Sequence, residues 1–513
     1  MLALTLLLTA VVPRLRAAGA AELDAFLERR RIERRLPPVP EAPDEMFLRR
    51  AYLKLTGAPP SPGAVRAFLR DRSPGKRAAL IDRLLNSPEF SELMAMRYCQ
   101  MFRVKSEFPI NLWPNAVQLF HAYLRDAAAA DVPYDKLVRD MLTASGSNFR
   151  SPGVNLLRAH ADRSPAGVAR GIALSLMGVR LEKSDRATVD GMAAFFSRIG
   201  RKNTDEWKEE VVFTLPEARR VEARTPDGRR FTIDAPAVDP RAVFADWLTA
   251  RDNPWFARAF ANRVWFWLFG SGWVEPADDL GKTEAGLPGG EKRLLPRTTP
   301  ELDFLAQAFK DGRCSVKGLF RTICNSRAFN ADWRVGRGSG DAVYRYFAAY
   351  PVHRMEPELA VDALAAVTGV HDSYRSVIPE PFTILPPGTP AVRISDGSIS
   401  SGTLDNFGRS PRDSGRLDEA RCYVTRAQRQ WLMNSGVLYG RLRRAARRVV
   451  RRERGDEARI DGIYLLALSR FPEPEERETI RRRLKSVKPR DRERVWTDVL
   501  WALVNTGEFL YHH

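Results

Sequence analysis

Residues 80–90 read Leu80-Ile-Asp-Arg-Leu-Leu-Asn-Ser-Pro-Glu-Phe90, a pattern typical of a helical protein. Its apolar residues recur at the spacing of one face of a helix as far as Asn86. Asn86 tolerates the left-handed turn that ends a helix, Ser87 can cap the next helix, and proline fits the first position of that helix. The stretch therefore predicts two helices that meet at a tight corner, with the ring of Phe90 packing back across it.

The same corner recurs along the chain. The pattern Asn-[Ser/Thr]-x-x-Phe is repeated at residues 325–329 and 505–509, with a looser copy at Asn434-Ser435. An old duplication and simple convergence on good helix caps both explain these repeats. Pairs of Ser, Asn or Thr with a following proline predict further helix starts at residues 61, 73, 151, 164, 253 and 299.

Residues 221–233 depart from the helical pattern. They alternate in character on both sides of Pro226-Asp227-Gly228, which is typical of a β-hairpin. The expected fold class is therefore mostly α, with two helical domains joined by a short β-containing connector. The predicted boundaries are a signal peptide at residues 1–20, an N-terminal helical domain at 21–202, the connector at 203–240 and a C-terminal helical domain at 241–513.

The composition narrows the function classes. The chain has 513 residues and a formal net charge of +19, which favours anionic partners. Its four cysteines are too few for a disulfide-dense scaffold, and the spacing of Cys314 and Cys324 leaves a bridge between them open. Residues 441–454 hold eight arginines, which suit either nucleic-acid binding or a solvated helix face. Because arginine is favoured throughout the chain, we prefer the solvated face and expect no nucleic-acid partner.

The first twenty residues predict export. Leu2–Val12 form an apolar run that is too short to span a bilayer, and Ala18 and Ala20 provide the small residues of a cleavage site. No basic residue precedes the run, so a retained anchor stays open alongside a cleaved signal. We expect a periplasmic or extracellular protein with no integral membrane span after signal removal.

Several long blocks resemble a known pair of families. Ala51-Tyr-Leu-Lys-Leu-Thr-Gly-Ala-Pro-Pro-Ser-Pro62 and residues 103–118 are similar to the PSCyt-two family. Asn253-Pro-Trp-Phe-Ala-Arg-Ala-Phe-Ala-Asn-Arg-Val-Trp-Phe-Trp-Leu-Phe-Gly-Ser-Gly272 and Phe407-Gly-Arg-Ser-Pro-Arg-Asp413 are similar to the PSD-one family. The resemblance implies an exported protein of Planctomycetes or Verrucomicrobia, built from two domains of unknown function. The gene neighbourhoods of such proteins suggest breakdown of polysaccharides, often sulfated ones.

The chain lacks the haem-binding motif that many members of the family carry. Many relatives carry a cytochrome-like Cys-x-x-Cys-His segment between a Gly-x-Arg-x-Glu element and Ala-Ala-Phe-Phe. Residues 178–196 hold both flanks, and the cysteines and histidine are absent. No Cys/His cluster has the spacing of a zinc site either. We therefore expect no haem, no metal and no other cofactor.

Three clusters are candidate sites. The first mixes cations, amides, a carboxylate and an indole in the way that sugar sites do, although the pattern favours a capped helix start with a buried tryptophan. Its members are Arg103, Lys105, Glu107, Asn111, Trp113, Asn115, Gln118 and His121. The second cluster joins Asn262 and Arg263 to the carboxylates of Asp278 and Asp279, with helix capping and core packing as the alternative.

The third cluster lies in a long loop, residues 371–426, rich in Pro, Gly and Ser. Arg409, Arg412 and Asp413 could bind an anion there or pin the loop to the fold. The favoured hypothesis is a protein that binds anionic polysaccharide, sulfated or uronate, or assists its processing.

The alternative is a glycan-acting enzyme, and the sequence leaves open whether any reaction is catalysed. Its candidate catalytic groups are Glu107, Asp278, Asp279 and Asp413, with His121 as a base. A redox role ranks below both hypotheses because the haem motif is missing.

Overall fold

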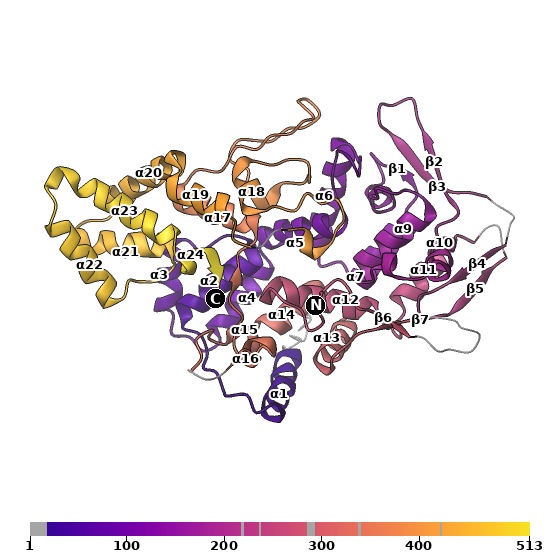
Figure 1. Cartoon of the computed structure of the whole chain (residues 1–513), viewed down its shortest axis with the longest axis horizontal. Helices are drawn as coiled ribbons and strands as arrows, with labels where there is room; N and C mark the ends of the chain where they lie inside the picture. The colour runs from indigo at the N-terminus through magenta and orange to yellow at the C-terminus, as the bar shows by residue number, and fades with distance from the viewer. Residues whose placement is uncertain (1–17, 217–219, 235–237, 285–292, 337–339, 421–422) are drawn as a thin grey trace, which may run out of the picture.

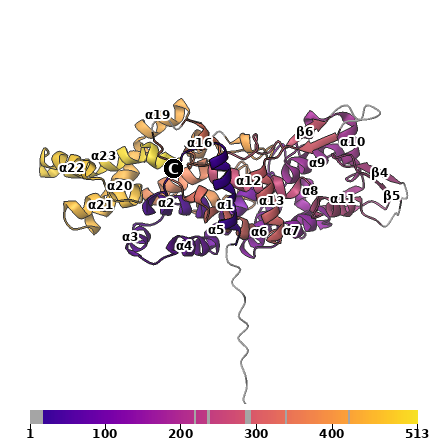
Figure 2. The same cartoon turned by 90° about the horizontal axis from the view of Figure 1, so that it is seen from below.

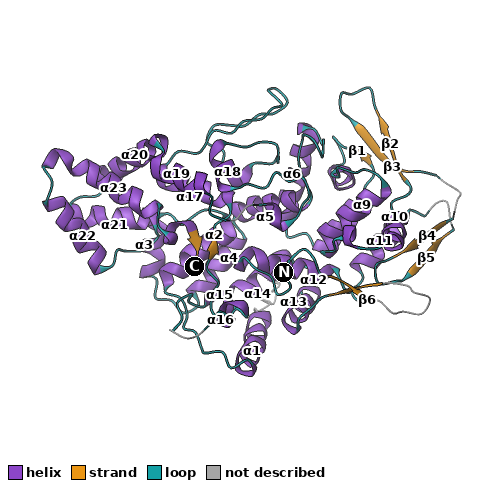
Figure 3. Ribbon diagram, in the orientation of Figure 1, coloured by secondary structure: helices purple, strands orange, loops and turns teal. Residues whose placement is uncertain are grey.

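Helices dominate the architecture, as predicted. The computed structural model describes residues 18–216, 220–234, 238–284, 293–336, 340–420 and 423–513. The predicted signal peptide lies outside these residues except for its last three, which begin the first helix. The strands form four small antiparallel sheets, one of three strands in the order β1-β3-β2 and three of two strands. Figure 3 shows how little of the described chain they occupy.

The first ten helices belong to the N-terminal part of the chain. They are α1 (Ala18–Glu33), α2 (Asp44–Thr56), α3 (Pro62–Arg70), α4 (Lys76–Leu85), α5 (Pro88–Met101), α6 (Pro114–Ala129), α7 (Tyr134–Leu142), α8 (Asn155–Arg158), α9 (Pro165–Ile172) and α10 (Arg186–Ala194). The next six are α11 (Pro240–Thr249), α12 (Phe256–Phe269), α13 (Pro300–Asp311), α14 (Val316–Cys324), α15 (Arg327–Asn330) and α16 (Ala342–Arg345).

Eight further helices follow. They are α17 (Pro357–Thr368), α18 (Gly402–Phe407), α19 (Arg426–Asn434), α20 (Gly436–Arg452), α21 (Asp456–Ala467), α22 (Pro474–Lys485), α23 (Arg492–Val504) and α24 (Gly507–Leu510). The strands are β1 (Gly146–Ser147), β2 (Ile199–Asn203), β3 (Glu210–Thr214), β4 (Val221–Arg224), β5 (Arg230–Ile233), β6 (Gly281–Glu284), β7 (Arg293–Pro296), β8 (His353–Arg354) and β9 (Tyr511–His512).

The predicted corners form, but the expected left-handed turn at their asparagines is wrong: Asn86, Asn325 and Asn505 end their helices at φ of −99°, −88° and −94°. The hydroxyl of Ser87 accepts a hydrogen bond from the backbone N–H of Phe90 at 3.3 Å and caps α5. The matching hydroxyls of Ser326 and Thr506 cap α15 and α24 in the same way. The phenylalanine of each corner is buried. The predicted hairpin is also confirmed, because β4 and β5 pair with Val221 opposite Ile233.

Two hydrophobic cores organise the elongated molecule. Helices α19–α23 lie at one end of the long axis and strands β1–β5 at the other (Figures 1 and 2). The larger core draws its residues from Leu23 to Tyr350, together with Leu465, and includes the fully buried indoles of Trp255 and Trp265. The smaller core joins α17 to the helices that follow it, and Leu53 of α2 reaches into it. The N-terminal helices therefore pack against both cores.

The three cysteines that the structure describes form no disulfide bond. Cys314 and Cys324 are both free, and burial raises the pKa of the Cys314 thiol to about 12. Cys99 is free and buried as well. No helix in the described ranges is both long enough and apolar enough to cross a membrane.

Candidate functional site

Two of the three candidate clusters lie against each other. The ammonium group of Lys105 binds Oδ1 of Asp413 at 2.5 Å. The backbone N–H of Ser106 donates to Oδ1 of Asp396 at 2.9 Å, and that of Glu107 donates to the hydroxyl of Ser398 at 3.1 Å. The loop that precedes α6 and the loop after α17 therefore form one continuous structure.

Three arginines that the sequence analysis predicted to bind a ligand are buried within these two loops and their neighbours. Arg103 donates through Nε to the carbonyl of Ala159 at 2.7 Å, and Arg412 donates to the carbonyl of Ser395 at 2.6 Å. Arg409 donates to Glu358 at 3.3 Å. Burial lowers the pKa of Arg103 and of Arg409 to about 10. These guanidinium groups hold the loops together from inside.

The second cluster is also engaged in internal contacts. The side chain of Asn262 is fully buried and satisfies four backbone groups of the loop that follows α12. Arg263 donates to the carbonyl of Leu174 at 3.2 Å.

The two adjacent carboxylates of this cluster have different partners. Asp278 pairs with Arg180, and Asp279 pairs with Lys183. Asp278 also accepts a hydrogen bond from the backbone N–H of Leu417 at 2.8 Å, which brings the second cluster against the loop that carries the third.

Glu107 and His121, the candidate acid and base of the first cluster, each have a buried side-chain atom without a hydrogen-bond partner among the described residues. Oε1 of Glu107 and Nε2 of His121 are buried and form no hydrogen bond within the described structure. Burial and the nearby Asp396 raise the pKa of Glu107. Burial, with Arg412 and Arg125 close by, lowers the pKa of His121 to about 4, so its imidazole is neutral at neutral pH.

The surface beside these loops is aromatic. The ring of Trp113, which is half-buried, lies 5.4 Å from the ring of Phe382 and 6.4 Å from that of Trp207. Trp207 and Phe382 are 68% and 42% exposed. The ammonium of Lys208 lies 5.4 Å from the Trp113 ring and 5.1 Å from the Trp207 ring. We call Trp113, Trp207, Lys208 and Phe382 the aromatic surface.

Local structure positions both tryptophans. Trp113 adopts a φ of 70° immediately before Pro114 begins α6, a conformation that side chains rarely take. Trp207 and Lys208 lie in the connection between β2 and β3. The buried amide of Asn148 donates to the carbonyl of Lys208 at 3.2 Å and accepts from the N–H of Glu210 at 2.8 Å, which anchors that connection.

Sequence reasoning found Trp113 and missed the other three members of the aromatic surface. Trp207 and Lys208 are adjacent in a polar stretch, and a tryptophan beside a lysine in such a stretch is the sequence pattern that could have identified them. Phe382 lies in the long loop and has no comparable pattern around it. The predicted residues Asn111, Asn115 and Gln118 are exposed near Trp113 along the chain. Among the described residues, no three His, Cys, Asp or Glu side chains are grouped to hold a metal ion.

Two family models match the chain. Residues 22–184 match PSCyt2, described as a protein of unknown function (DUF1549), and residues 240–484 match PSD1, described as a protein of unknown function (DUF1553). No curated protein and no solved structure matches the chain. Trp113 lies in the first matched region, Phe382 in the second, and Trp207 and Lys208 between them. The aromatic surface is thus formed by residues of both matched regions and of the segment between them.

Proposed function

We propose that this chain, which joins a PSCyt2 domain to a PSD1 domain, is an exported protein that binds anionic polysaccharide on its aromatic surface. The observation that carries the proposal is the position of Lys208 over the rings of both Trp113 and Trp207. A single ligand chain could contact both indoles and the ammonium group at once.

The chemistry of the aromatic surface suits charged sugars. Indole rings present flat, apolar faces with a polar edge, and such faces pack well against the C–H surface of a sugar ring. An exposed ammonium at the same place pairs with a sulfate or carboxylate group, at a strength that falls as salt is added. The net charge of +19 further attracts polyanions to the whole molecule.

Affinity chromatography and calorimetry test the proposal with the full chain. The probes are chondroitin sulfate and polygalacturonate, with uncharged dextran as the neutral control. We expect retention on the two anionic polymers at low salt and release as sodium chloride is raised. Trp207→Ala and Lys208→Glu should each weaken binding about tenfold, the equivalent of one lost charged or aromatic contact.

The matched control is Lys202→Glu, which makes the same charge change on β2, on the same hairpin but outside the aromatic surface. It should bind nearly as well as the wild type. Equal weakening by Lys208→Glu and Lys202→Glu, with no weakening by Trp207→Ala, would show that net charge, and not the aromatic surface, holds the polymer. Absence of retention on both anionic polymers would end the proposal.

A second function, cleavage of the bound glycan, is favoured by two carboxylates of the loops that also carry Trp113 and Phe382. Glu107 and Asp396 are neighbours, and each has one buried oxygen that forms no hydrogen bond within the described residues. A carboxyl group with a raised pKa can act as a general acid, and a second carboxylate completes the pair that glycoside hydrolysis needs. Glu107→Gln should then abolish release of reducing ends while binding persists. Unchanged release by this variant would exclude the role.

A further inference from the structure

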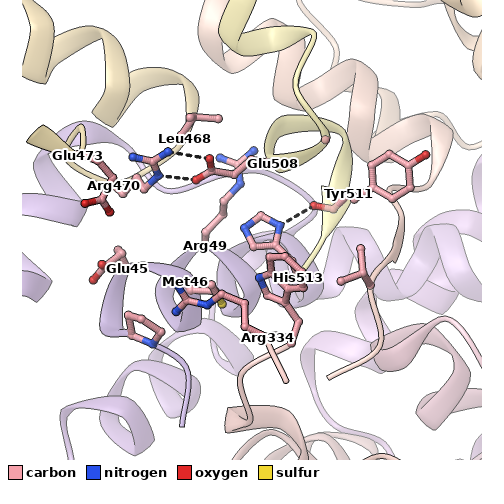
Figure 4. Close-up of a pocket in the computed structure, with 14 residues that line it drawn as sticks. Glu45, Met46, Arg49, Arg334, Leu468, Arg470, Glu473, Glu508, Tyr511 and His513 are labelled. Carbon is pink, nitrogen blue, oxygen red and sulfur yellow. Dashed lines mark hydrogen bonds and ion pairs between the residues drawn. The ribbon is translucent and has the colours of Figure 1, made fainter. Parts of the chain in front are cut away.

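A cavity lies where the start of α2 meets the last residues of the chain. Its volume is about 530 Å³, within the range of pockets that hold small molecules. Met46, Trp333, Val352, Leu468 and Tyr511 give it a largely apolar lining. Figure 4 shows the charged groups that accompany them.

Arg49 is the unusual member of this lining. Its side chain projects from α2, and the residue is 3% exposed. Its two terminal nitrogens donate to neutral oxygens: the carbonyl of Ala467 at 3.0 Å, the hydroxyl of Ser469 at 3.1 Å and the carbonyl of Phe509 at 3.4 Å. Its Nε has no partner within the described structure.

The other arginines of the cavity are neutralised. Arg470 binds both oxygens of Glu508, at 2.5 and 2.8 Å, and also pairs with Glu476. Arg334 pairs with Asp332 at 2.7 Å. Both oxygens of Glu508 therefore bind Arg470, although this carboxylate lies near enough to Arg49 to favour the charged guanidinium.

The remaining titratable side chains of the lining are those of Glu45, Glu473 and His513. Glu45 is half-exposed and Glu473 is exposed, so water solvates both. Burial lowers the pKa of His513 to about 4, so this imidazole carries no charge at neutral pH. Arg49 is thus the buried cation of the cavity that forms no hydrogen bond or ion pair with a carboxylate of the described residues.

We propose that this cavity binds a small organic carboxylate with an apolar body, and that Arg49 receives the carboxylate. A buried charge without a counter-ion is costly, and an incoming anion removes that cost. A guanidinium group also matches a carboxylate in geometry better than any other side chain does. The apolar lining then contributes through burial of the ligand body. This site is separate from the aromatic surface and does not depend on the proposed polysaccharide binding.

Isothermal titration with the full chain tests this site with 4-phenylbutyrate and 4-phenylbutanol, which share a body and differ in charge. We expect the carboxylate to bind at least about tenfold more tightly than the alcohol, because the alcohol offers no charged hydrogen bond. Arg49→Met should remove that preference. Equal binding of the two probes, or no binding of the carboxylate, would overturn the proposal.

A second variant guards against a folding defect in Arg49→Met. Val352 lies on the lining and is 45% exposed, so Val352→Trp should fill the cavity without disturbing a core. This variant should lose carboxylate binding at an unchanged melting temperature. The matched control is Val437→Trp, a 66% exposed position of α20 outside the cavity lining, which should bind as the wild type does. Retained binding by Val352→Trp would place the ligand elsewhere and refute the site.

Discussion

The ammonium group of Lys105 lies 2.5 Å from a carboxylate oxygen of Asp413, a residue 308 positions further along the chain. The first residue belongs to the region that matches PSCyt2 and the second to the region that matches PSD1. The contact therefore joins the two matched regions at the place where the sequence analysis put two of its candidate clusters. This ion pair links the loop that carries Trp113 to the loop that carries Phe382.

A double-mutant cycle measures the contribution of this ion pair. Lys105 is largely buried and Asp413 is 39% exposed, so solvent screens the pair in part. We expect a coupling free energy of about 1 kcal/mol between Lys105→Met and Asp413→Asn in urea unfolding. A parallel cycle between Lys105→Met and the exposed, distant Asp126→Asn should show additive changes. Additivity in both cycles would mean that the Lys105–Asp413 pair stabilises nothing.

The stability of the loop after α12 should depend on one amide. Asn262 donates to the carbonyls of Val274 and Ala277 and accepts from two backbone N–H groups. Asn262→Ala leaves four buried backbone groups unsatisfied, so we expect a loss of about 3 kcal/mol or more in the free energy of unfolding. Gln118→Ala, an exposed change on α6, should alter it by less than about 0.5 kcal/mol. Similar values for the two variants would contradict the structural role of Asn262.

Acid should destabilise the fold in a defined range of pH, and His121 should account for part of the loss. Its pKa is about 4 in the folded chain, against 6.5 for an unperturbed histidine. The unfolded chain therefore binds the proton first, so stability is full above pH 6.5 and falls as the pH drops towards 4. The contribution of this residue is about 3 kcal/mol over that range.

His121→Leu tests this contribution with the full chain unfolded in urea at several pH values. The variant should lose less stability than the wild type between pH 6.5 and 4, because leucine gains no proton in either state. The other five histidines also have lowered pKa values, so a residual slope should persist in the variant. Parallel curves for variant and wild type would show that His121 takes up its proton equally in both states.

Local signals account for much of the predicted fold. Hydroxyl caps, N-terminal prolines and aromatic residues three positions on act within one turn of chain, so the corner at Ser87 and its counterparts could be recognised from short stretches. The hairpin at residues 221–233 also follows from a local turn. The predicted domain boundaries remain predictions.

The candidate site required information that no short stretch contains. An arginine that pins a loop and an arginine that binds a ligand have the same local pattern, and only distant packing buries Arg103 and Arg412. The neighbours of Trp113 are equally distant in sequence: Trp207 comes from a strand connection and Phe382 from the long loop. Sequence reasoning could therefore single out Trp113 but not the residues from other segments that surround it.

Two glycine substitutions should have opposite effects, because one helix position is crowded and the other is open. A Cβ atom added at Gly171 of α9 would lie 2.2 Å from Nδ1 of His160, beside the guanidinium of Arg103. Overpacking of this kind should cost about 2 kcal/mol in the free energy of unfolding of Gly171→Ala. At Gly440, inside α20, an added Cβ meets nothing within 4 Å. Gly440→Ala should stabilise the chain by about 1 kcal/mol through helix propensity alone. Urea unfolding of both variants measures these changes in the free energy of unfolding. A Gly171→Ala chain as stable as the wild type would show that His160 moves aside without cost.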